Sequence, residues 1–164
     1  MNEFNIKFMK EALKQAQKAY DKGETPIGAV IVHDNKIIAR AHNERETKKN
    51  ALCHAEITAI NKACKRLGGW RLINCDMYVT LKPCPMCAGA VVQSRINNLY
   101  FGAFDLKSDC AVPAADAVDN ILNSNVNVVG GVMRDECSKI IKDFFVDLRK
   151  KKKTNSNQEG NICG

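Results

Sequence analysis

The chain has 164 residues, which is enough for one domain with a sizeable hydrophobic core. Its hydrophobic content of 45% and charged content of 26% are ordinary for a soluble globular protein, and no apolar run approaches the roughly 20 residues that span a bilayer. Residues 1–5 lack the basic start and apolar core of a signal peptide. We therefore expect a cytoplasmic protein with no membrane contact, whose eight cysteines stay as thiols.

The net charge of +7 is concentrated near the C-terminus. Arg149 and Lys150 to Lys153 contribute five of the positive charges, which leaves +2 for the rest of the chain. A block of this kind is usually a solvated helix end, but it is also suited to binding phosphates through counterion release. Charge alone leaves nucleic-acid binding open.

Hydrophobic periodicity predicts ten elements of secondary structure. The expected helices cover residues 4–20, 55–67, 84–94, 114–122 and 134–150. The expected strands cover residues 27–32, 36–41, 76–81, 98–102 and 126–129, the first two as a hairpin turning at Asp34-Asn35. This order predicts a layered α/β domain over residues 1–150 with helices on both faces of one sheet, followed by a basic and polar tail, 151–164.

Two short segments carry residues suited to metal chemistry, Cys53-His54-Ala55-Glu56 and Pro83-Cys84-Pro85-Met86-Cys87. One histidine and a Cys-x-x-Cys pair provide three ligands of the kind that zinc takes, and three protein ligands are typical of a catalytic site with an open position. Glu56 can lie beside the metal without binding it, where a general acid/base is needed. The alternative is a closed structural zinc site with His42 or another cysteine as fourth ligand, which would have no use for Glu56.

Both segments lie where a predicted helix begins. Unpaired N–H groups and the positive end of the helix dipole favour thiolates there, and they can also donate to a substrate oxyanion. An apolar helix start would also tolerate cysteines, but it would not explain two segments built in the same way.

Two further features allow two interpretations each. Asn43 follows a strand, in a polar loop that runs to Asn50. It could hydrogen-bond a substrate, but its spacing alone favours the capping of a turn. His42 beside it is interpreted as a loop histidine rather than a metal ligand. The Phe144-Phe145 pair is either core packing, the default, or an aromatic platform for bases.

With these residues placed, the chain resembles the bacterial tRNA-specific adenosine deaminases of the cytidine deaminase superfamily from about residue 4 to 150. The matching motifs include Thr25-Pro26-Ile27-Gly28-Ala29-Val30, Ala41-His42-Asn43, His54-Ala55-Glu56-Ile57, Trp70-Arg71-Leu72, Tyr78-Val79-Thr80-Leu81, Pro83-Cys84-Pro85-Met86-Cys87-Ala88-Gly89-Ala90, Ser94-Arg95-Ile96 and Phe101-Gly102-Ala103. The metal motif by itself supports only a zinc-dependent deaminase of a nucleobase. The Phe-Phe helix with its basic extension is what resembles the tRNA group.

The resemblance implies a three-layer α/β/α sandwich with a central mixed five-stranded sheet. It also implies hydrolysis of adenosine to inosine at the wobble position of a tRNA anticodon, by a homodimer with one Zn²⁺ per subunit. In that family His54, Cys84 and Cys87 correspond to the zinc ligands and Glu56 to the proton shuttle. The substrate contacts that it implies are Asn43, Ala55, Pro83, Asp105, Lys107, Phe145 and Arg149.

The chain departs from the family at two places. Lys82 stands where the family usually has glutamate, so that it either adds positive charge near the metal or points to solvent. Residues 108–113 lack the glycine-rich run that commonly follows the Asp-x-Lys loop. Two rival functions stay open, a deaminase of a free nucleobase or nucleoside such as guanine or cytidine, and a non-catalytic zinc-stabilised RNA-binding subunit, against which Glu56 argues.

Overall fold

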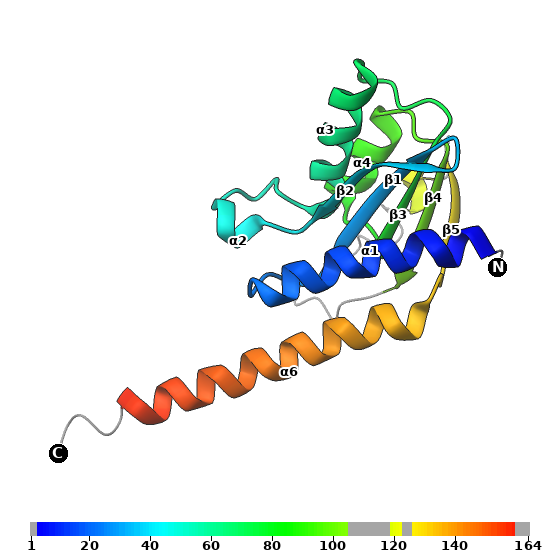
Figure 1. Cartoon of the computed structure of the whole chain (residues 1–164). Coiled ribbons are helices and arrows are strands. Elements are labelled where there is room, and N and C mark those ends of the chain that lie inside the picture. Colours follow the sequence, from blue (N-terminus) through cyan, green and yellow to red (C-terminus); the bar gives the residue numbers. More distant parts are fainter. Residues whose placement is uncertain (1–2, 105–118, 123–125, 160–164) are drawn as a thin grey trace.

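The computed structural model describes residues 3–104, 119–122 and 126–159, which form one sheet covered by helices (Figure 1). The strands are β1 (Gly28–His33), β2 (Lys36–His42), β3 (Cys75–Leu81), β4 (Asn98–Ala103) and β5 (Asn127–Gly130). The helices are α1 (Glu3–Asp21), α2 (Arg45–Lys48), α3 (Ala55–Leu67), α4 (Pro85–Gln93) and α6 (Arg134–Glu159). None of these helices combines the length and the apolar character that crossing a membrane requires.

The sheet has the strand order β2-β1-β3-β4-β5 and is mixed. Strand β1 pairs antiparallel with both β2 and β3, whereas β3, β4 and β5 run parallel. Parallel neighbours need a crossover, and α4 provides the one between β3 and β4. The predicted mixed five-stranded sheet is confirmed.

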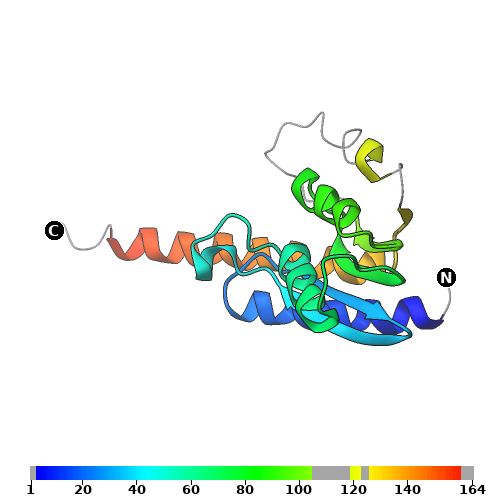
Figure 2. The same ribbon diagram turned by 90° about the horizontal axis from the view of Figure 1, so that it is seen from above.

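Alternation along the strands divides the core into two layers. Ala29 and Ile31 pack toward α3 and α4, while Val30 and Val32 pack toward α1 and α6. This alternation is expected because successive side chains of a strand point to opposite faces. Figures 1 and 2 show the helix pairs on opposite sides of the sheet, which is the predicted α/β/α sandwich.

Two glycines let the helices approach the sheet closely. A Cβ atom on Gly28 would lie 2.0 Å from the Ala12 carbonyl oxygen of α1, and one on Gly102 would lie 2.3 Å from Cys137 Sγ of α6. Side chains at these two positions would push α1 and α6 away from the core.

Helix α6 is longer than expected, since it continues to Glu159 rather than ending near residue 150. Residues 134–159 contain no glycine or proline, and lysine is a good helix former, so the basic run extends the helix instead of leaving it. The short helix α2 lies in the stretch expected to be a loop. The helix expected over 114–122 falls mostly outside the described residues, although residues 119–122 are helical.

Candidate active site

Each half of the metal motif begins a helix. His54 immediately precedes α3 with φ −72° and ψ 153°, and Cys84 precedes α4 with φ −71° and ψ 168°. Both conformations are extended, as expected of the residue that precedes a helix, and Pro85 has the fixed φ that suits a first helical position. Neither side chain forms a capping hydrogen bond to its own helix. The imidazole and the thiol therefore face each other across the two helix starts.

The three predicted ligands meet in one cluster. Cys84 Sγ lies 3.8 Å and Cys87 Sγ 3.6 Å from His54 Nδ1, and the three ligand atoms all lie within 4.8 Å of one another. A tetrahedral zinc ion with bonds of about 2.3 Å to sulfur and about 2.0 Å to nitrogen separates these ligands by about 3.6 Å. The two sulfur-to-nitrogen distances are close to this value, so the cluster suits a zinc ion. Among the described residues the cluster holds three such groups, which leaves a position open and gives the closed structural site no fourth ligand.

The carboxyl group of Glu56 lies buried in the first turn of α3. Its side chain is 4% exposed, and its Oε2 atom has no hydrogen-bond partner in the described part of the chain. Burial raises the pKa of this carboxyl. An unsatisfied buried polar atom costs about 1–3 kcal/mol, so its retention is typical of a functional group rather than of packing.

The two thiols of the cluster shift the pKa of each other in opposite directions. A hydrogen bond from the Cys87 thiol lowers the pKa of Cys84 to about 4, with His54 contributing in the same direction. The same bond, together with burial, raises the pKa of Cys87. This environment favours the thiolate form of Cys84, which is the form that binds a metal cation.

Asn43 is buried and held by the loop around it. Its Nδ2 donates to the Thr25 carbonyl oxygen at 3.3 Å, and its Oδ1 accepts from the Arg45 backbone N–H at 3.4 Å. The second bond satisfies the start of α2, as the turn-capping interpretation expects. One N–H and one lone pair of the carboxamide remain available, so the same side chain can also bind a base.

The other predicted substrate contacts are distributed over the molecule. Ala55 and Pro83 are buried next to the predicted metal ligands His54 and Cys84. Asp105 and Lys107 lie outside the described residues, as does the departure at residues 108–113.

Phe144 and Phe145 differ in their surroundings. Phe144 is buried and its ring meets Tyr20 edge-on at 5.4 Å, which confirms core packing for this residue. Phe145 is half-buried, and Arg149 is exposed one turn further along α6. Phe145 is therefore the member of the pair that stays accessible to a ligand.

Two features of the site were not predicted from the sequence. Lys82 is paired, because its Nζ lies 2.9 Å from Asp119 Oδ1. Glu24 is 1% exposed and accepts hydrogen bonds from two backbone N–H groups of α2. Both interactions join residues far apart in sequence, and no local pattern marks either residue.

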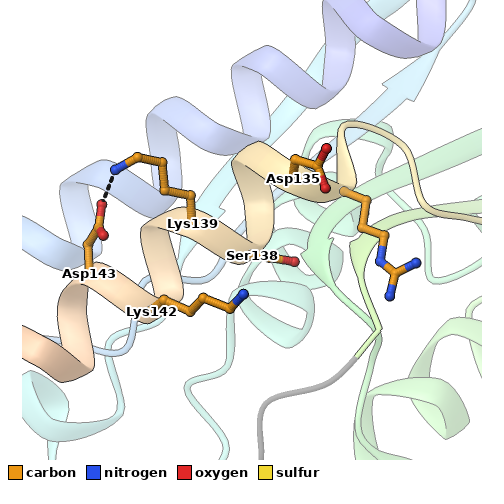
Figure 3. A pocket seen from close by; sticks show the side chains of 6 residues that line it. Asp135, Ser138, Lys139, Lys142 and Asp143 are labelled. Carbon is orange, nitrogen blue, oxygen red and sulfur yellow. Dashed lines mark hydrogen bonds and ion pairs between the residues drawn. The ribbon is translucent and has the colours of Figure 1, made fainter.

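A separate hollow lies on the outer face of α6. It is lined by Arg134, Asp135, Ser138, Lys139, Lys142 and Asp143 (Figure 3). Lys139 and Asp143 form an ion pair of 2.5 Å, so the hollow carries both signs of charge. None of the metal-cluster residues lines it.

The chain is similar to known deaminases over most of its length. The MafB19-like deaminase family matches residues 2–149. The chain is 52% identical over 147 residues to the tRNA-specific adenosine deaminase of Bacillus subtilis (strain 168), covering 89% of this chain and 91% of that protein.

Solved structures show the same similarity. One, from studies of A-to-I editing by tRNA:A34 deaminases at the wobble position of transfer RNA, is 40% identical with a TM-score of 0.73, and the match covers 82% of this chain and 98% of the other. The structure of a guanine deaminase from Bacillus subtilis is 41% identical with a TM-score of 0.59, over 63% of this chain and 66% of the other.

Proposed function

The chain belongs to the MafB19-like deaminase family, among the tRNA-specific adenosine deaminases, and we propose that it hydrolyses adenosine to inosine at the wobble position of a tRNA anticodon. The observation that carries the chemistry is the meeting of His54, Cys84 and Cys87 beside the buried Glu56. The substrate is supported by the identity to tRNA-specific relatives over nearly the whole chain.

We assign one Zn²⁺ per subunit to His54, Cys84 and Cys87, whose donor atoms have the spacing of a tetrahedral site. When bound there, zinc supplies the Lewis acidity that makes a water molecule nucleophilic near neutral pH. Three protein ligands leave the position that such a water needs.

Glu56 moves the proton in this scheme. Its Oε2, which has no partner in the described part of the chain, would take a proton from the water whose oxygen bonds to C6 of the base, and would pass a proton on to the base, whose amino group leaves C6 as ammonia while the C6–N bond breaks. Water is consumed and ammonia is released, so the atoms balance. Asn43 holds the base through the remaining donor and acceptor of its carboxamide, with Ala55 and Pro83 as buried walls. The target base must leave its stack, which an anticodon loop permits at low cost.

The basic helix supports an RNA substrate. Residues 149–153 are exposed, and Figure 1 shows α6 extending past the sheet. Side chains placed there can contact phosphates, with Phe145 nearer the body of the protein. We retain Asp105 and Lys107 as substrate contacts on the family resemblance. We divide the chain into a deaminase domain, 1–150, and a basic and polar extension, 151–164, because the family match ends at residue 149.

We also propose a homodimer, located in the cytoplasm where tRNA is used. Helix α4 contains no charged residue, and its half-buried residues include Met86, Ala90 and Val92. Ala90 and Val92 also pack against the core, and the apolar surface that such half-buried residues leave suits burial against a second subunit. Sedimentation that gives a monomer at micromolar concentration would refute the dimer.

A deaminase of free guanine is the second candidate, since a guanine deaminase structure is 41% identical over 63% of this chain. The basic extension favours tRNA, because a small neutral substrate gives no role to five clustered cations.

The test is mass-spectrometric nucleoside analysis after incubation of zinc-loaded protein with a stem-loop that carries adenosine at the wobble position. Free guanine and cytidine run in parallel, and the Glu56→Ala variant is the control. Inosine formed only from the stem-loop, and only by wild-type protein, is the expected result. Deaminated guanine or cytidine without inosine would replace the proposed substrate and leave the site intact.

A further inference from the structure

Glu24 is a buried carboxylate outside the metal cluster. It directly follows Gly23, a turn residue just after α1 with φ +75°, and it is 1% exposed. Among the described residues the only other buried carboxylate is Glu56. A buried charge is costly unless hydrogen bonds compensate it, so its partners indicate what it is for.

The carboxylate of Glu24 binds the first turn of α2. Its Oε2 accepts the Glu46 backbone N–H at 3.2 Å, and its Oε1 accepts the Thr47 N–H at 2.6 Å. The preceding N–H, that of Arg45, donates to Asn43 Oδ1 at 3.4 Å. Glu24 and Asn43 thus share the N–H groups that a helix start leaves unpaired. A helix of four residues cannot be stable by itself, so these bonds hold α2 in place.

Helix α2 lies in the loop that joins the substrate residue Asn43 to the metal ligand His54. The Asn43 backbone N–H donates to the Ile27 carbonyl oxygen at 3.0 Å, and the Glu44 N–H donates to the Cys53 carbonyl oxygen at 3.0 Å. The second bond closes the loop directly before His54. A shift of α2 would therefore move Asn43 at one end of the loop and disturb the approach to His54 at the other.

We propose that Glu24 is a positioning residue, which fixes the loop from Asn43 to His54 and thereby the direction in which the Asn43 carboxamide meets the base. The proposal rests on the proposed function in one respect, that Asn43 binds the base. Glu24, which lies just after α1, would thus contribute to substrate selection.

The backbone N–H groups of Glu46 and Thr47 need two acceptor oxygens, which an ionised carboxylate provides. Burial alone would raise the pKa of Glu24, but the N–H groups of Thr47 and Glu46 outweigh it, and the pKa lies below its usual value. A glutamine has one acceptor oxygen, and its NH₂ group would face the second N–H. Glu24→Gln therefore keeps the size of the side chain and breaks one bond of the pair.

The first experiment measures how firmly the loop is held and needs no turnover. Hydrogen exchange of the Glu46 and Thr47 amides is compared in wild-type protein, Glu24→Gln and Glu46→Gln. The last variant removes an exposed carboxylate from the same helix. We expect Glu24→Gln to speed exchange by about tenfold to a hundredfold, the effect of one hydrogen bond to a charged group, and Glu46→Gln to leave it unchanged. Unchanged exchange in Glu24→Gln would overturn the proposal.

The second experiment asks whether the loop acts through Asn43. We expect Glu24→Gln to lower kcat/KM on the stem-loop by about tenfold to a hundredfold, with zinc content near wild type. In an Asn43→Ala background the same substitution should cost less than about twofold, because the group that Glu24 positions is gone. A loss of the same size in both backgrounds would overturn the proposal.

The two experiments separate the two proposals. If wild-type protein deaminates no RNA, the proposed function fails, and the exchange rates still decide whether Glu24 holds the loop. If RNA is deaminated and Glu24→Gln loosens the loop without lowering kcat/KM, the function stands and the positioning role fails.

Discussion

The ammonium group of Lys82 lies 2.9 Å from Asp119 Oδ1 and ties residues 119–122 to the start of the α4 half-site. Lys82 also donates its backbone N–H to the Ala103 carbonyl oxygen at 2.8 Å, which fixes the lysine beside β4. At position 82 this chain therefore has one half of an ion pair. A glutamate here would face Asp119 with the same charge.

This pairing predicts the result of a charge exchange. We expect Lys82→Glu to lower the free energy of unfolding by about 1 kcal/mol, since a partly exposed attraction becomes a repulsion. The Lys82→Glu/Asp119→Lys double variant should recover most of that loss. Urea unfolding of Lys82→Glu, Asp119→Lys and the double variant measures the coupling energy between the two side chains. Additive losses would show that the two side chains do not interact.

Glycine substitutions should separate close packing from helix propensity. We expect Gly28→Ala to destabilise the protein by about 3 kcal/mol or more, because the new methyl group would meet the α1 backbone. Gly89→Ala is the matched control in α4, where a Cβ atom has nothing within 4 Å. That change should stabilise by about 0.5–1 kcal/mol. Unfolding curves of both variants test this, and equal effects would contradict the close approach of α1.

Tyr20 and Asp147 predict a loss of stability at alkaline pH. The Tyr20 hydroxyl donates to Asp147 Oδ2 at 2.5 Å, and this bond raises the pKa of Tyr20 to about 12. The neutral phenol is the donor, so the contribution to stability is complete below the unfolded pKa of about 10 and is lost as pH rises through the folded one.

The measurement compares wild-type protein with Tyr20→Phe. Their difference in unfolding free energy should stay constant up to about pH 10 and shrink above it. Phenolate absorbance should show one fewer late-titrating tyrosine in the variant. A difference that grew with pH would contradict the assigned donor.

The basic extension should determine how RNA affinity depends on salt. Changing Lys150 to Lys153 together to glutamine keeps helix propensity and removes four exposed charges. We expect the slope of log affinity against log salt to fall by about 0.9 for each phosphate of a duplex stem that the variant no longer neutralises, with kcat unchanged. The control changes four exposed lysines of α1 to glutamine, namely Lys7, Lys10, Lys14 and Lys18. Equal slopes in the two variants would mean that only net charge matters.

Local patterns were sufficient to predict most of the fold. The alternation of Ala29 and Ile31 with Val30 and Val32 marks a strand buried on both faces, and the helix starts at His54 and Cys84 follow from the apolar periodicity after them. The same two starts predicted that His54, Cys84 and Cys87 would lie together, as they do.

The features that the sequence did not predict depend on contacts between residues far apart in the chain. Helix α2 is too short for periodicity to show, and it is held by Glu24 from another part of the chain. Lys82 and Asp119 are joined only when β3 and residues 119–122 are folded together. The sequence predicts that the last helix ends near residue 150, whereas α6 continues to Glu159. A run of lysines is typical of a solvated tail, but lysine also has a high helix propensity.

The split of the metal cluster between α3 and α4 has a consequence for protein lifetime. A cation bound there would join residues thirty positions apart, and only the folded chain presents all three ligands together. Binding to the folded state alone stabilises it by about 2.7 kcal/mol when the free metal exceeds its dissociation constant a hundredfold. Proteases act on the open chain, whose population falls by the corresponding factor. The zinc supply of the cell would then govern how long each molecule survives as well as how fast it works.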